Sequence, residues 1–303
     1  MDAVFDDDTF QEKPARPGLH LVVCIKQVPD SAQIRVHPVT NTIMRQGVPT
    51  IINPYDLFAL EEAMRLRDQY GGEVTVLTMG PPMAEEALRR ALGHGADKAV
   101  LITDRRFAGA DTLATSYALA AALEKLGAER PIDLVFTGKQ TIDGDTAQVG
   151  PGVARRLGLS QLTYVAAIDL LDPHAREIFV RRRAEGGLQV LRSKLPCLVT
   201  VLEGVNEIRR GSIEDMLRAA RAEVTVWSAA DAGIEDLQKC GLRGSPTMVR
   251  KVFAPSPREE SAEMVAVDGK KPAQIAAAVL DLVFAHQPKL ETELGAAGRE
   301  ERR

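Results

Sequence analysis

Short apolar runs alternate with helical patterns between residues 19 and 157, and this alternation constrains the fold more than any other feature of the chain. Runs typical of strands cover residues 19–25, 73–78, 98–103 and 133–137. The stretches between them have helical spacing or are rich in alanine. Strands that alternate with helices in this way form a mostly parallel sheet with right-handed crossovers. The sequence therefore predicts an α/β fold with an open, mostly parallel, Rossmann-like sheet.

The first long helix has the best defined start. Asn53 is placed to cap it, Pro54 suits its first position, and Asp56 favours the positive end of the helix dipole. Two glycines, at 71 and 72, end the pattern. These local roles explain the residues fully, so a ligand role for Asn53 or Asp56 has to come from elsewhere.

The stretch at residues 138–150, GKQTIDGDTAQVG, joins a strand to the start of a helix. Open α/β sheets bind ligands at such junctions because unpaired helix N–H groups point outwards there. Gly144 and Gly150 allow a close backbone approach, while Thr146 and Gln148 offer neutral hydrogen-bonding groups. The same residues equally fit a plain polar turn with an Asp or Thr cap.

The motifs of two common nucleotide sites are missing from this stretch. It has neither G-x-G-x-x-G nor the lysine motif of a P-loop. Its two aspartates would repel a phosphate, so backbone N–H groups and neutral side chains would have to hold one. The carboxylates would face ribose hydroxyls, amides or the helix start instead.

Composition excludes several classes of function. The 303 residues carry a formal net charge of -4, which gives no basic footprint for nucleic acid. Cys24, Cys197 and Cys240 lie far apart, so we expect no protein-ligated metal, and any redox chemistry requires an organic cofactor. No apolar run approaches the roughly 18 residues of a membrane helix, and no signal peptide is evident. We therefore expect a cytoplasmic protein that does not insert into membranes.

The rest of the chain differs in character, and three regions are expected: a disordered leader at 1–18, an α/β nucleotide-binding or flavin-binding domain at 19–227, and an extended C-terminal arm at 228–303. Within the domain, period-two runs at 162–171, 177–183, 188–191 and 198–202 predict added antiparallel strands. Within the arm, residues 273–284 predict a helix that is apolar nearly all round. Such a helix needs burial, either on a partner subunit or on its own domain.

Five motifs in order resemble the β subunit of electron-transfer flavoprotein, and the match runs from about residue 19 to 225. They are VCIKQVPD at 23–30, NPYD at 53–56 with EEA at 61–63, TMGP at 78–81, the stretch 138–148, and KLP at 194–196. The resemblance implies a heterodimer with a homologous α subunit that holds flavin adenine dinucleotide (FAD). It also implies a carrier of electrons with no catalytic residue of its own, so its status as an enzyme stays open.

The details of the stretch 138–150 bear on which ligand the β subunit holds. Many family members bind adenosine monophosphate (AMP) there and have a run of aspartates followed by Cys-Asn-Gln. This chain has Gly144 in place of the middle aspartate and continues with TAQV at 146–149. It resembles the branch whose β subunit holds a second FAD, and its long arm resembles the nitrogen-fixation (Fix) members of that branch. Gly144 would leave room for a pyrophosphate beside the backbone.

Carried over by motif, the resemblance implies a cofactor site with contributions from four parts of the chain. The residues are Cys24, Asn53, Pro54, Tyr55, Asp56, Met79, Asp143, Gly144, Asp145, Thr146, Ala147, Gln148, Val149, Gly150, Pro151, Gly152, Val153 and Ala154. A loop just after Lys-Leu-Pro docks partners in dehydrogenase-fed members. Here that loop is residues 203–210, and Val205 stands where the family usually has leucine.

The function implied by the resemblance is electron bifurcation. Electrons from NADH would go partly to ferredoxin or flavodoxin and partly to a quinone oxidoreductase, with NADH oxidation only in the complex of α and β subunits. An ordinary one-flavin carrier with structural AMP is the alternative. A nucleotide-binding module without redox function, and a structural subunit with a vestigial site, would also fit the residues.

Overall fold

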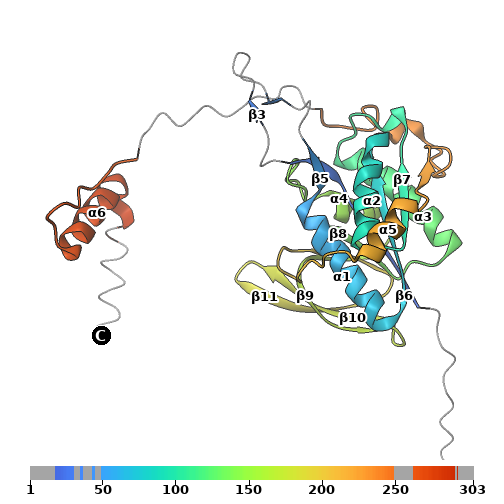
Figure 1. Cartoon of the computed structure of the whole chain (residues 1–303), viewed down its shortest axis with the longest axis horizontal. Coiled ribbons are helices and arrows are strands. Elements are labelled where there is room, and N and C mark those ends of the chain that lie inside the picture. The colour runs from blue at the N-terminus through green and yellow to red at the C-terminus, as the bar shows by residue number, and fades with distance from the viewer. Residues whose placement is uncertain are drawn as a thin grey trace, which may run out of the picture. The chain divides into compact units, whose positions relative to one another are not determined.

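The structure is a computed structural model that describes residues 18–30, 35–36, 43–44, 49–248, 262–290 and 292. The chain forms two units, Met1–Ala254 and Pro255–Arg303. The first unit contains a nine-stranded sheet of mostly parallel strands, which confirms the predicted fold class (Figure 1). The predicted leader lies outside the described residues, apart from Gly18.

The sheet has the strand order β11-β10-β9-β12-β8-β1-β6-β7-β13. The strands are β1 (Leu19–Cys24), β6 (Gly72–Met79), β7 (Lys98–Ile102), β8 (Leu134–Gly138), β9 (Ser160–Asp172), β10 (Glu177–Ala184), β11 (Gly187–Lys194), β12 (Cys197–Val201) and β13 (Thr225–Trp227). Strands β2 (Gln27–Pro29) and β5 (Thr50–Ile52) form a separate antiparallel pair, as do β3 (Arg35–Val36) and β4 (Ile43–Met44).

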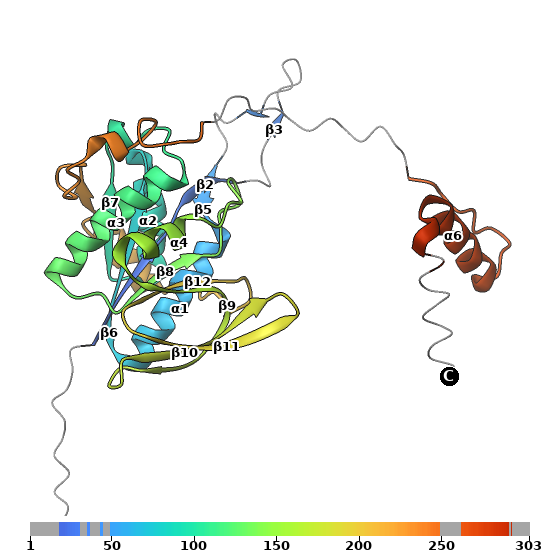
Figure 2. The ribbon, with the colours of Figure 1, turned by 180° about the vertical axis from the view of Figure 1, so that it is seen from behind.

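Helices cover both faces of the sheet. They are α1 (Pro54–Tyr70), α2 (Glu85–His94), α3 (Thr112–Glu129), α4 (Val149–Leu157) and α5 (Ile213–Arg221), with short 3₁₀ helices η2 (Pro82–Ala84), η3 (Arg105–Phe107) and η4 (Leu237–Lys239). Figure 1 shows α1, α2 and α5 on one face, and Figure 2 shows α3 and α4 on the other. The result is a three-layer arrangement in which the sheet is the middle layer.

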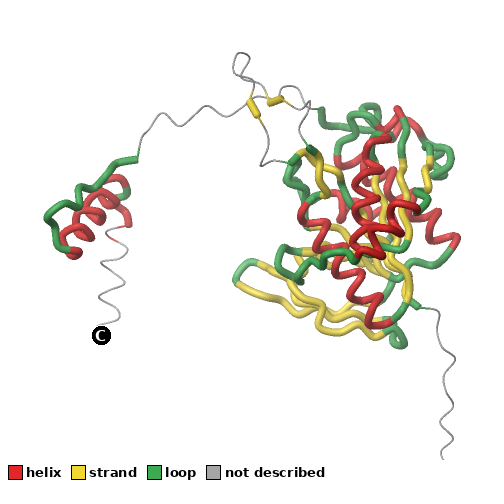
Figure 3. Tube along the Cα trace, viewed as in Figure 1, coloured by secondary structure: helices red, strands yellow, loops and turns green. Residues whose placement is uncertain are grey.

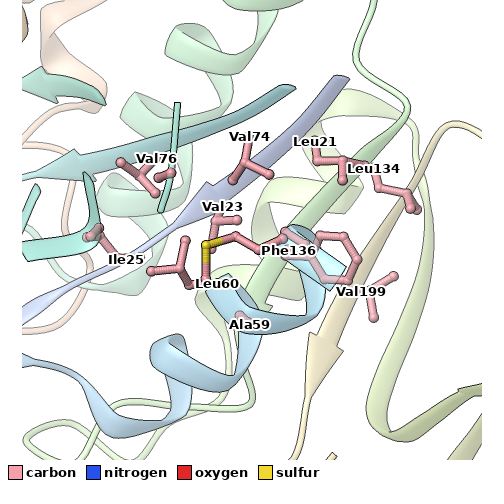
Figure 4. Packing of buried hydrophobic residues seen from close by; sticks show 14 of the residues in the cluster. Leu21, Val23, Ile25, Ala59, Leu60, Val74, Val76, Leu134, Phe136 and Val199 are labelled. Carbon is pink, nitrogen blue, oxygen red and sulfur yellow. The ribbon is translucent and has the colours of Figure 1, made fainter. Parts of the chain in front are cut away.

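Strand β1 shows why the central strands are mainly apolar. All six of its residues are buried, and successive side chains point to opposite faces of the sheet. Leu21 and Val23 join the core cluster beneath α1 and α2, whereas Val22 and Cys24 join the cluster beneath α3 and α4. Figure 4 shows the first of these clusters, in which Phe136 of the sheet and Leu60 of α1 pack together.

The predicted added strands form a ribbon at one end of the sheet. Strands β9, β10 and β11 pair antiparallel, and Figure 3 shows them as the long yellow strands at the lower left of the first unit. The prediction was wrong for the run at 198–202. Strand β12 inserts between β8 and β9 and is parallel to both. All five of its residues are buried, as a central parallel strand requires.

Residues beyond Trp227 extend the packed part of the first unit. Ala229, Ala232, Ile234 and Cys240 are buried in the cluster beneath α3. Buried residues thus continue past position 227, where the compact domain was expected to end. The second unit contains α6 (Pro272–His286), which spans the predicted helix at 273–284 and has no buried residue.

Candidate functional site

The strand order reverses between β1 and β8, which marks the predicted binding edge. From β1 the chain continues to β6 and then β7 on one side, while β8 and β12 lie on the other. Ligands of open α/β sheets bind outside the carboxyl ends of the strands at such a switch point. The segments at this point are residues 25–26 after β1 and residues 139–148 between β8 and α4.

Asp56 joins the ends of β1 and β8. Its carboxylate accepts the backbone N–H of Lys26 at 2.8 Å and that of Gly138 at 3.0 Å. The side chain is only 4% exposed. Burial raises the pKa of Asp56 to about 7, although hydrogen bonds from Asn53 and from these two backbone groups act to lower it. Asp56 therefore has both oxygens committed to the protein.

Asn53 fixes the segment after β8 from the same helix end. Its Nδ2 donates to the carbonyl of Gln140 at 2.8 Å, and its Oδ1 accepts the N–H of Ile142 at 3.2 Å. Asn53 is the N-cap residue of α1 but makes no side-chain capping bond, so the predicted capping contact was wrong. Its side-chain amide instead bonds to the backbone of Gln140 and Ile142, which lie 87 and 89 positions further along the chain. Asn53 and Asp56 thus shape this edge of the sheet, and both residues are buried.

The aspartates of the segment make different bonds. Lys26 Nζ donates to both carboxylate oxygens of Asp143 at 2.8 Å. Burial acts to raise the pKa of Asp143, but the Lys26 ammonium holds it below its ordinary value. Asp145 accepts a hydrogen bond from the neutral amide of Gln140 at 2.6 Å. Asp145 and Ala147 have φ values of 52° and 55°, the left-handed region that is costly for residues with a side chain.

The N-terminus of α4 lies at the end of this segment. Its N-cap residue, Gln148, makes no capping bond, because its side chain accepts a hydrogen bond from Thr112 at 2.9 Å. The first N–H groups of a helix lack intrahelical acceptors, and those of Val149 and Gly150 belong to this class. An uncapped helix N-terminus favours an anion.

Three glycines have distinct roles here. A Cβ on Gly150 would lie 2.9 Å from Thr137 Oγ1, and one on Gly152 would lie 2.9 Å from Ser116 Oγ. Both glycines therefore let α4 pack closely on the sheet and on α3. A Cβ on Gly144 would meet only Thr141 Oγ1, at 3.1 Å, among described atoms within 4 Å. Gly144 itself is exposed.

The remaining predicted residues lie partly at the exposed edge of the sheet, at the carboxyl ends of the strands, and partly in the core. Cys24 is buried at the end of β1, and burial, with a smaller effect of Asp56, raises the pKa of its thiol to about 12. The Tyr55 ring lies below Lys139 Nζ at 4.6 Å. Thr146 is exposed, Met79 is half-buried at the end of β6, and Pro54 and Pro151 occupy helix starts. Val153 and Ala154 are fully buried against the core, away from this edge.

Two lysines at this edge were absent from the predicted site. Lys26 pairs with Asp143, and Lys139 pairs with Glu203 at 3.0 Å. Both belong to the motifs that carried the family resemblance, but no local pattern reveals partners 117 and 64 residues away. Lys139 also links the site to residues 203–210, the loop after β12.

That loop is held against α1. Arg209 donates to both oxygens of Glu61, at 2.8 and 2.9 Å, and Asn206 donates to Glu62 at 2.8 Å. Val205 packs against the core cluster, so its side chain is turned inwards. The exposed apolar side chains nearby are instead on α5, where Ile213 and Met216 are 73% and 57% exposed.

An apolar cleft of about 630 Å³ lies on the helical face formed by α1, α2 and α5. Its lining includes Ile52, Leu57, Met216 and Ala219, and none of residues 138–150. Among the described residues there is no cluster of His, Cys, Asp or Glu that could hold a metal ion. The described helices also include none that is long and apolar enough to cross a membrane.

Comparison with known proteins shows the family. The model of the electron transfer flavoprotein domain matches residues 40–232. The chain is 68% identical to "Protein FixA" of Azorhizobium caulinodans over 282 residues, which cover 93% of this chain and 99% of that protein. It is 65% identical to "Protein FixA" of Bradyrhizobium diazoefficiens over 285 residues, 94% and 98% of the two chains. It is 49% identical to "Electron transfer flavoprotein subunit beta" of Clostridium acetobutylicum over 233 residues, 77% and 87% of the two chains. The chain therefore belongs to the electron transfer flavoprotein family, as a β-type electron-transfer subunit of the Fix type.

Proposed function

We propose that this subunit binds FAD at the β1/β8 switch point and passes electrons as part of a heterodimer with an electron-transfer flavoprotein α subunit. The observation that supports it best is the uncapped N-terminus of α4, which ends an exposed polar segment at the reversal of strand order. FAD supplies reversible acceptance and donation of electrons, which the protein side chains at this site cannot do.

The residues present fit the phosphate end of such a cofactor. The N–H groups of Val149 and Gly150 stand at the helix start, and Gln148 is turned aside towards Thr112. Thr146 and Ala147 lie beside them on the exposed segment. The open space around Gly144 favours a dinucleotide over AMP, because a pyrophosphate needs close access to the backbone.

The arm supplies the contact with the α subunit in this proposal. In α6, Val279, Leu280 and Val283 are 44%, 49% and 39% exposed. Exposed apolar side chains on successive helical turns are typical of a helix that docks in a groove. Val283→Glu should weaken the heterodimer in size-exclusion chromatography, whereas Asp281→Asn on the same helix should not. Equal elution of wild type and Val283→Glu would contradict a docking role for α6.

The proposed electron route is bifurcation in the cytoplasm. NADH is the donor to the complex of α and β subunits, ferredoxin or flavodoxin is one acceptor, and a quinone oxidoreductase is the other. The Fix names of the relatives support a supply of electrons for nitrogen fixation. An ordinary carrier with AMP in the β subunit would share the fold and the partner but would lack the second flavin.

The visible absorption spectrum of the heterodimer tests the redox assignment. A complex purified with its α subunit should be yellow, and a colourless complex would favour a nucleotide-binding module without redox function. Asp145→Ala should change ligand content and turnover, because it removes both the acceptor that holds Gln140 and one carboxylate of the segment. Asp169→Ala serves as the control, because the Asp169 side chain is exposed on β9, away from this segment. Unchanged ligand and turnover in Asp145→Ala would favour a structural subunit with a vestigial site.

A further inference from the structure

The proposed nucleotide site contains negative charges that would repel an anionic ligand. Its segment carries two aspartates, Asp143 and Asp145, within six residues of the α4 N-terminus that would receive a phosphate. Asp145 is held by the neutral amide of Gln140, and no ion pair of Asp145 occurs within the described part of the chain. A carboxylate close to a bound anion opposes its binding.

Lys26 is placed to offset one of these charges. Its backbone N–H is fixed by Asp56, and its side chain reaches across the switch point to both oxygens of Asp143 at 2.8 Å. The side chain of Lys26 is 47% exposed and that of Asp143 is 33% exposed, so both groups border the open edge. A flexible lysine on a fixed base can neutralise Asp143 and still face a bound anion.

The other lysine at this edge is committed elsewhere. Lys139 pairs with Glu203 at 3.0 Å, lies over the Tyr55 ring and is only 15% exposed. Its charge therefore serves the link between the site and the loop at 203–210. Among the residues that the structure describes, the Lys26 ammonium is therefore the cation that pairs directly with an aspartate of the acidic segment.

We propose that Lys26 is a positioning residue of the nucleotide site, whose ammonium neutralises Asp143 and so allows the segment at 138–150 to accept the phosphate of an adenine nucleotide. This inference rests on the nucleotide site proposed above and assigns it a charge-compensating residue. It requires that Lys26 act on charged ligands and have little effect on an uncharged nucleoside.

The test compares AMP with adenosine on the full chain by isothermal titration calorimetry. Lys26→Gln should weaken the binding of AMP about tenfold, equivalent to about 1.4 kcal/mol. The affinity for adenosine should stay within about twofold of the wild-type value. The variant should fold, because the contact with Asp56 uses the backbone N–H of residue 26. Lys26→Arg should retain AMP binding. Lys26→Gln combined with Asp143→Asn should recover most of the loss, because the charge left unbalanced is then removed as well.

Lys98→Gln provides the matched control. Lys98 forms a similar exposed ion pair with Glu73 at 2.9 Å, but it lies at the amino end of β7, at the opposite edge of the sheet. Its loss should leave AMP binding unchanged. Unchanged AMP binding in Lys26→Gln, or equal losses of affinity for AMP and adenosine, would contradict the proposed role of Lys26. Neither result would contradict the nucleotide site itself. A wild-type chain that binds neither ligand would overturn the nucleotide site and this inference with it.

Discussion

The carboxylate of Asp56 accepts the backbone N–H of Gly138 at 3.0 Å, so a side chain in the first turn of α1 fixes the end of β8. The same carboxylate fixes Lys26 after β1. The two strands that flank the switch point are thereby held by one buried acid. The geometry of the proposed site depends on this contact.

Asp56→Ala should destabilise the protein by about 3 kcal/mol, because it leaves two N–H groups without their acceptor. Chemical denaturation of the full chain measures the change. Asp236→Ala is the control, since that exposed aspartate accepts a single backbone N–H from Gln238 and its loss should cost about 1 kcal/mol. Equal losses in the two variants would contradict the role given to Asp56.

The pH dependence of stability should carry a signature of Asp56. Burial raises the pKa of Asp56 from its ordinary value of 3.8 to about 7, so the folded state holds the proton more tightly than the unfolded state does. The stabilisation from this group is therefore full below about pH 4, falls as the pH rises to 7, and is lost above that. Relative to Asp56→Asn, wild type should lose stability between about pH 4 and 7 and change little above pH 8. Parallel unfolding curves for the two proteins across this range would exclude the raised pKa.

Arg209→Ala should destabilise the chain by about 2 kcal/mol, because it leaves the nearly buried Glu61 carboxylate without its cation. The partial exposure of Arg209 limits the effect. Arg181→Ala breaks a pair with Asp169 in which both side chains are exposed, and it should cost less than about 0.5 kcal/mol. Thermal unfolding of both variants checks the contrast. Limited proteolysis should also cut residues 203–210 faster in Arg209→Ala.

Gly144→Asp should shift the bound ligand from FAD towards AMP. The new side chain would start 3.1 Å from Thr141 Oγ1 and place a third carboxylate beside Asp143 and Asp145. It would narrow the space assigned to a pyrophosphate and add repulsion against its second charge. Chromatography of the released ligands measures the ratio. An unchanged FAD content would show that Gly144 does not decide the ligand.

The sequence predicted those parts of the fold that local chemistry determines. Helix α1 begins at Pro54 and ends at Tyr70, just before the two glycines that were expected to end it. The direction of β12 could not be predicted, because it depends on pairing with β8 and β9 and not on its own apolar pattern. A run of five buried residues fits a parallel or an antiparallel neighbour equally well.

The site was predictable as a region but not as a set of bonds. The glycines and polar residues at 138–150 and the strand ends around them indicated the switch point. The contacts from Asn53 to Gln140 and from Lys26 to Asp143 join residues 87 and 117 positions apart, and only the folded sheet brings them together. Asn53 shows most clearly what sequence patterns cannot predict. It occupies the N-cap position of α1, but its side chain bonds to a loop that is distant in the sequence.

The most direct test of the central claim is the count of ligands released when the heterodimer is denatured. The chain should be purified with its α subunit, and the supernatant after denaturation should be quantified for FAD and AMP against protein. Two FAD molecules per heterodimer are expected if this subunit holds FAD at the β1/β8 switch point. One FAD and one AMP would contradict that claim and identify an ordinary one-flavin carrier.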